Sequence, residues 1–147
     1  MKIRIPLTAL LCLIAPLAAF AADDSPSELD DTMEQLNTQY RKLTRQVSNP
    51  ARNADSLQAV TALRERAVEA MKMEPKRKAD VPAAQQAKFV TDFRAKMKDF
   101  LAEVDKLEAS LKAGKNDEAA SVLKSLKQFQ EDGHKEFKRG KDDKKKG

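Results

Sequence analysis

Apolar residues recur along most of the chain at steps of three and four, and no stretch shows the alternation typical of a strand. This spacing gathers apolar side chains on one face of a helix. The first such stripe follows Ser25-Pro26-Ser27-Glu28, in which Ser25 and Glu28 form a capping box with proline at the first helical position. Asn49-Pro50 ends the helix. Its apolar positions are Leu29, Met33, Leu36, Tyr40, Leu43 and Val47.

Three further helices are predicted by the same spacing. The second covers residues 54–73 and ends before Pro75, since proline disfavours the helical conformation in the residue before it. The third begins near Ala83 and ends at Gly114, a residue typical of helix C-termini. The fourth is capped by Asn116 or Asp117. The three stripes are Leu57, Val60, Leu63, Ala67 and Met71; Phe93, Met97, Phe100, Val104, Leu107 and Leu111; and Ala119, Leu123, Leu126, Gln130, Gly133 and Phe137, flanked by Val122, Phe129 and His134.

These elements predict an all-α fold, an antiparallel up-down-up-down four-helix bundle. Only Lys115 and Asn116 separate the third helix from the fourth, and a turn this short makes them antiparallel neighbours. Residues 74–82 form the longest connection, which we predict to be a mobile loop.

The first 21 residues have the pattern of a signal peptide. Lys2 and Arg4 give a positive start, residues 7–19 are mostly apolar, and Ala19-Phe20-Ala21 matches the small-x-small cleavage pattern. A membrane anchor is disfavoured because Pro16 interrupts an apolar run shorter than the roughly 20 residues that a spanning helix needs. We therefore expect cleavage after Ala21, export and no stable membrane insertion.

Cleavage would remove Cys12, the chain's single cysteine. The mature protein would then have no disulfide, no thiolate metal site and no thioether-linked c-type haem. Residues 22–138 are expected to form one domain, and the protein is expected to be a monomer. The formal net charge is +5, and residues 139–147 are expected to form a basic, disordered tail. We expect no nucleic-acid binding, because the tail lacks interleaved aromatic residues; attraction of an acidic partner protein is a minor hypothesis.

Met33 and His134 are predicted to lie close together although they stand near opposite ends of the sequence. The first and fourth helices of such a bundle are neighbours, so the start of one and the end of the other meet. A thioether and an imidazole are the axial ligands of Met/His haem sites, and His134 is the chain's one histidine. The alternative is that Met33 only fills the core and that His134 is a surface or capping residue.

Three segments resemble one known family. Met33-Glu34-Gln35-Leu36-Asn37 matches a Met-Glu-x-Leu-Asn pattern, and Asp92-Phe93-Arg94 matches a segment of the third helix. Gly114-Lys115 matches the turn before the fourth helix, with the same interval to the histidine. The family they resemble is that of cytochrome b562, a periplasmic haem protein that is itself an example of the up-down-up-down bundle. The family pattern has arginine where this chain has Gln130, and phenylalanine where this chain has Met97.

This resemblance implies an electron-transfer protein and not an enzyme. It implies one non-covalent haem b with Met33 and His134 as the iron ligands, and unidentified periplasmic redox partner proteins. Gly133 either lets the haem edge approach closely or marks a fraying helix end. The walls of the haem pocket would include Leu29, Leu36, Phe93 and Met97.

Another class of function stays open on the residues alone. A haem-free exported bundle could act as an interaction or chaperone-like protein, with Met33 and His134 as ordinary residues. Metal binding by His134 with Glu131, Asp132 and Glu136 is a less specific hypothesis, because such acids on a helix are usually solvated. Catalysis is disfavoured by the lack of a recognisable nucleophile or phosphate-binding loop.

Overall fold

The computed structural model describes residues 27–138, which form four long helices and no strand. The predicted signal peptide, Ser25, Pro26 and the basic tail of residues 139–147 lie outside the described residues. Two short 3₁₀ helices, η1 and η2, stand on either side of α2. The elements are α1 (Glu28–Gln46), η1 (Pro50–Arg52), α2 (Asn53–Ala70), η2 (Lys76–Asp80), α3 (Ala83–Lys112) and α4 (Asn116–Phe137).

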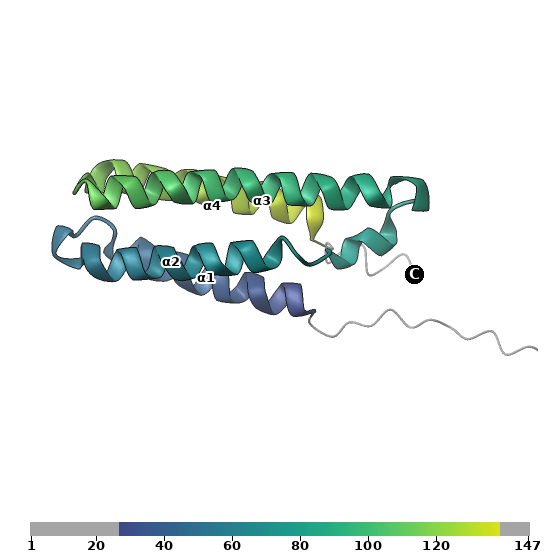
Figure 1. Cartoon of the computed structure of the whole chain (residues 1–147), viewed down its shortest axis with the longest axis horizontal. Helices are drawn as coiled ribbons and strands as arrows, with labels where there is room; N and C mark the ends of the chain where they lie inside the picture. The colour runs from purple at the N-terminus through teal and green to yellow at the C-terminus, as the bar shows by residue number, and fades with distance from the viewer. Residues whose placement is uncertain (1–26, 139–147) are drawn as a thin grey trace, which may run out of the picture.

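The helices form the predicted antiparallel bundle (Figure 1). Helices α1 and α2 make one layer, and α3 and α4 make the other. The contacts between α1 and α2, α3 and α4, and α2 and α3 are extensive, whereas α1 and α4 have few. The start of α1, η2 and the end of α4 lie at the same end of the bundle (Figure 1). The loosely joined pair is therefore the one that carries Met33 and His134.

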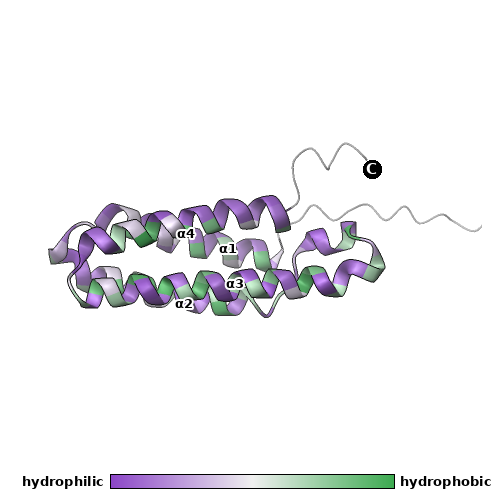
Figure 2. Cartoon of the chain, turned by 90° about the horizontal axis from the view of Figure 1, so that it is seen from above, coloured by the Kyte–Doolittle hydropathy of each residue, from purple (hydrophilic) through white to green (hydrophobic). Residues whose placement is uncertain are grey.

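The predicted stripes supply most of the core. In Figure 2, hydrophobic residues recur along each helix between hydrophilic ones. All six apolar positions of the α3 stripe are buried, while Met33, Tyr40, Leu57 and Met71 are only partly buried. The fully buried apolar side chains of the core include Leu43, Val60, Leu63, Val104, Leu107 and Leu126.

The start of α1 differs from the prediction. Its capping box is formed by Ser27 and Asp30, not by Ser25 and Glu28. The Ser27 Oγ accepts from the Asp30 amide at 3.2 Å, and the Asp30 carboxylate accepts from the Ser27 amide at 3.0 Å. These two bonds satisfy helix-end donors that have no partner within the helix, so the helix begins at Glu28.

The end of α2 also comes earlier than predicted, at Ala70 and not at Met73. The amide of Lys72 donates to the Glu69 carbonyl, and the amide of Met73 donates to the Ala70 carbonyl. These bonds span three residues, so the chain narrows into 3₁₀-type turns before Pro75. The predicted end of α3 is confirmed, since Gly114 takes the left-handed conformation, with φ 70°, directly after it.

The predicted cap of α4 is wrong. The N-cap is Lys115, which makes no side-chain cap bond, and Asn116 is instead a buried residue inside the helix. Its Nδ2 donates to the Val47 carbonyl at 2.6 Å and to Asn53 Oδ1 at 2.7 Å. Asn53 Nδ2 in turn lies 3.4 Å from the Leu111 carbonyl. The two amides thus join ends of all four helices at the end of the bundle away from Met33.

We expect Asn116→Ala to lower the free energy of unfolding by about 2 kcal/mol, because it leaves buried polar groups without partners. Urea unfolding followed by circular dichroism measures the change. Gln128→Ala is the control, since it removes an exposed amide of the same helix and should change stability by less than about 0.5 kcal/mol. Equal losses in the two variants would contradict the role assigned to Asn116.

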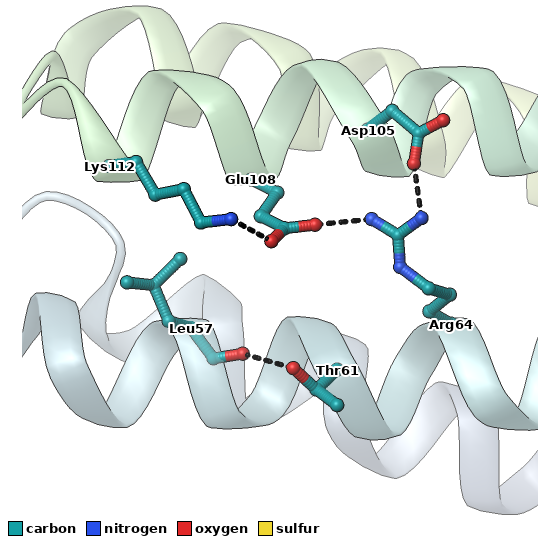
Figure 3. A network of polar contacts seen from close by, with 6 residues as sticks. All are labelled: Leu57, Thr61, Arg64, Asp105, Glu108 and Lys112. Atoms are coloured by element: carbon teal, nitrogen blue, oxygen red, sulfur yellow. Dashed lines mark hydrogen bonds and ion pairs between the residues drawn. The ribbon is translucent and has the colours of Figure 1, made fainter.

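Ion pairs join α2 to α3 on the side of the bundle shown in Figure 3. The Arg64 guanidinium pairs with Asp105 and Glu108, and Lys112 pairs with Glu108 as well. The hydrogen bond from Lys112, together with the charge of Arg64, lowers the pKa of Glu108 below its ordinary value. Glu108 is therefore ionised at neutral pH, and its ion pair with Arg64 helps to fix α2 against α3.

Residues 74–82 are not the loop that the sequence predicted. Their central part is the 3₁₀ helix η2, and Pro75 before it is buried. The side chain of Arg77 bonds to carbonyls at the end of α4. The length of the connection did not reveal this, because the partners of Arg77 are distant in the sequence.

Within residues 27–138, none of the helices combines the length and apolarity that a membrane-spanning segment requires.

Candidate functional site

A cavity of about 540 Å³ lies at the end of the bundle where α1 begins and α4 ends. This volume falls within the range of about 300–1,000 Å³ that is typical of small-molecule and cofactor sites. Residues from α1, α3, α4 and the segment around η2 line it. The apolar part of the lining consists of Leu29, Leu36, Pro75, Phe93, Met97, Phe100, Phe129 and Phe137, besides Met33.

All six residues proposed from the sequence line this cavity. Met33 lies in the second turn of α1 and is partly buried, and His134 lies in the last turns of α4. A thioether and an imidazole from the first and last helices therefore share one apolar space. The other four are Leu29, Leu36, Phe93 and Met97.

The loose contact between α1 and α4 leaves room for the cavity. Besides the bond from Asn116 to the Val47 carbonyl at the far end, polar side chains tie the two helices together: Tyr40 donates its hydroxyl to the Leu123 carbonyl at 3.3 Å, and Gln130 Nε2 donates to Asn37 Oδ1 at 3.4 Å. Asn37 and Gln130 themselves line the cavity, whereas Tyr40 lies further along α1. The interface is thus tied together beside the cavity and open where Met33 and His134 lie.

His134 is suited to act as a metal ligand. Although much of the residue reaches solvent, partial burial lowers the pKa of its imidazole, and the positive charge of Lys138 lowers it further. The imidazole is therefore mainly neutral at neutral pH, which is the form that binds a metal. Within the described residues, no group of three or more His, Cys, Asp or Glu side chains is arranged to hold a metal ion, so the hypothesis of a site with Glu131, Asp132 and Glu136 receives no support.

Charged groups of both signs surround the cavity. Asp30, Asp31 and Glu34 line it from α1. Burial alone would raise the pKa of Asp30, but hydrogen bonds with Ser27 and the charges of Lys76 and Lys138 lower it overall. The basic lining residues come from three elements: Lys76, Arg77, Lys96 and Lys138.

Phe129 and Phe137 give the cavity a second aromatic wall on α4. The Phe137 ring lies 5.4 Å from the Phe93 ring and 5.3 Å from the Phe89 ring, measured between centroids. The ammonium of Lys96 lies 5.6 Å from the centre of the Phe129 ring, within the range of a cation–π contact. These rings fix the α4 side of the cavity against α3.

Gly133 lies beside His134 inside α4, about one turn before the helix ends. A β-carbon at this position would have no neighbouring atom within 4 Å, although the residue lines the cavity. Glycine inside a helix costs about 1 kcal/mol relative to alanine. Packing within the protein therefore does not require glycine at this position.

Sequence reasoning missed the contribution of the η2 segment. Pro75, Lys76 and Arg77 line the cavity, but their positions carry none of the helical periodicity that revealed the other walls. The presence of Pro75 in this connection was a usable signal, because a proline ring can pack in the interior without a backbone donor to satisfy. In the structure Pro75 is buried.

A comparison with known protein families gives a match that covers the whole bundle. A sequence model described as cytochrome b562 matches residues 28–138, which include every helix of the bundle. No curated protein matches the chain in a direct comparison of sequences.

Proposed function

Because the chain belongs to the cytochrome b562 family of haem-binding electron-transfer bundles, we propose that it is a periplasmic electron carrier with Met33 and His134 as the axial ligands of one haem b. The observation that carries the proposal is that these two side chains, from the first and last helices, line one apolar cavity. They are the ligand pair of electron-transfer haems of the Met/His type.

The residues present fit a haem. The cavity has a ligand-sized volume, aromatic and aliphatic walls, and a neutral imidazole and a thioether in its lining. Gly133 leaves a space that a β-carbon would occupy. Lys138 and Lys96 line the cavity as cations, and ammonium groups are suited to meet the carboxylates of a haem.

When bound, haem supplies a one-electron redox centre. With Met33 and His134 both assigned to the iron, no open coordination position is left for a substrate, so we assign electron transfer and not catalysis. A thioether ligand from Met33 would favour the reduced state, and the apolar walls would disfavour extra charge, so both would raise the reduction potential. Redox partner proteins of the same compartment would exchange the electron.

Attachment is expected to be non-covalent. The one cysteine, Cys12, lies in the predicted signal peptide, so the mature chain has no thiol to add to a haem vinyl group. Acid-acetone treatment of the purified protein should therefore extract all haem, leaving a colourless polypeptide. Retention of haem on the chain would contradict this assignment. Absorption spectra of oxidised and reduced samples show whether the apoprotein takes up haem. If it takes up none, the haem-free interaction protein is favoured instead.

Because of the space at Gly133, we expect one substitution to raise the stability of the apoprotein and to lower its affinity for haem. We expect Gly133→Ala to stabilise the apoprotein by about 1 kcal/mol, because alanine is the better helix former and its methyl meets no atom. The same methyl should weaken haem binding, because it enters the cavity. Urea unfolding and haem titration measure the two effects.

Ser125→Ala is the matched control, since Ser125 is an exposed position of α4 outside the cavity. It should raise helix stability slightly and leave haem affinity unchanged. If Gly133→Ala also leaves haem affinity unchanged, Gly133 does not mark the approach of the haem.

A further inference from the structure

Arg77 makes the contact that ties η2 to the end of α4. Its Nη1 donates to the carbonyl of Lys135 and to the carbonyl of Glu136, each at 2.8 Å. Both residues lie in the last turn of α4, where carbonyls have no amide partner within the helix. A positive guanidinium at this end also complements the negative end of the helix dipole. Arg77 is therefore a C-terminal cap supplied from another part of the chain.

This cap lies directly beside His134. The carbonyl of His134 accepts from the Lys138 amide at 3.1 Å, and the next two carbonyls accept from Arg77. Arg77 and the buried Pro75 line the same cavity as His134. One short segment thus forms part of the cavity wall and holds the backbone that carries the imidazole.

Few other contacts fix this turn. Helix α4 meets α1 only sparsely, and the last apolar anchor of α4 is Phe137, which packs against Phe89 and Phe93 of α3. Its exposed neighbours Lys135 and Glu136 do not contribute to the core. Without Arg77 the turn would lose this tie to η2 and would keep the packing of Phe137 and the attraction between Lys138 and Asp30. A similar bond is found at the end of α2, where Arg94 Nε donates to the Met71 carbonyl at 3.2 Å.

We propose that Arg77 is a positioning residue that holds the last turn of α4, and with it the His134 imidazole, in the orientation required for haem ligation. The part concerning the imidazole rests on the proposed haem function. The part concerning the helix end is independent of haem, because the hydrogen bonds of Arg77 exist in the protein without haem. Arg77 is suited to this task because a planar guanidinium directs its donors in fixed directions, whereas a lysine ammonium is a flexible point charge.

The test compares Arg77→Ala with Lys78→Ala. Lys78 is the next residue of η2 and pairs with Glu74, but it does not line the cavity. Amide hydrogen exchange in the two apoproteins is measured first. Arg77→Ala should speed exchange in residues 135–138 by about tenfold, as expected for the loss of charge-assisted hydrogen bonds, with α3 unchanged. Lys78→Ala should leave residues 135–138 as in the original protein. Equal exchange in both variants would overturn the proposal.

The second measurement is made on the haem-loaded proteins. Arg77→Ala should release haem to an acceptor protein about tenfold faster than Lys78→Ala and show a weaker low-spin absorption spectrum. Faster exchange with unchanged haem release and spectrum would overturn the positioning role and leave only a helix cap. If the original protein takes up no haem, the proposed function fails, and the exchange measurement alone decides whether Arg77 holds the helix end.

Discussion

Replacing His134 by alanine should remove most haem binding. Loss of a group that merely supports a metal ligand costs about 10- to 100-fold in affinity, so loss of the nitrogen ligand itself should cost more. No second histidine exists in the chain to take its place. Titration of the apoprotein with haem, followed by absorption, measures the change. An affinity within a few fold of the original would show that His134 is not a ligand.

Met33→Ala should have a different effect. The iron would still be held through His134, but it would lose its sixth ligand, so the spectrum should change from low-spin toward high-spin and the reduction potential should fall. Met97→Ala is the matched control, because Met97 is a thioether on α3 that also lines the cavity. It should alter packing and keep a low-spin spectrum. If Met33→Ala keeps an unaltered spectrum and potential, Met33 is not an axial ligand.

The positions of Met33 and His134 could be predicted from the sequence, whereas other parts of the site could not. Helical periodicity placed Met33 on the inner face of α1 and His134 at the border of the α4 face, and the short turn at Gly114 fixed the order of the helices. Those rules are local, and the bundle topology follows from them. They were enough to bring the two residues to one end of the molecule.

Local rules did not decide between competing short-range partners. Ser25 and Ser27 both stand three residues before an acid, and the structure uses Ser27 with Asp30. Asn116 has the chemistry of a cap, but its partners are Val47 and Asn53, which are distant in sequence. The choice in such cases depends on which groups tertiary packing brings near, and a single helix does not contain that information.

The same limit explains why η2 was missed as part of the site. Its charged residues carry no periodic signal, and the function of Arg77 depends on two backbone carbonyls of α4, which are present in any sequence. Main-chain acceptors appear only when the fold places them opposite a donor. Residues that pack in the core were therefore predictable from the sequence. Residues such as Arg77, whose hydrogen bonds go to main-chain carbonyls distant in the sequence, were not.

Loading with haem should raise the stability of the whole bundle. A ligand that binds only the folded state adds about 4 kcal/mol when its free concentration is a thousand times the dissociation constant. For a domain of this size that corresponds to a rise of about 15 °C in melting temperature. Met33 and His134 come from α1 and α4, the adjacent helices with the fewest mutual contacts, so iron ligation would join the weakest interface of the bundle.

Thermal unfolding followed by circular dichroism, with and without haem, measures this effect. Hydrogen exchange should show the greatest added protection near Met33 and His134, and little at the Asn53 and Asn116 end, where side-chain hydrogen bonds already join the helices. His134→Ala in the same excess of haem is the control, and most of its rise in melting temperature should be lost. Equal melting temperatures of the original protein with and without haem would contradict specific binding in the folded bundle. A rise retained in full by His134→Ala would instead locate the haem away from the proposed ligands.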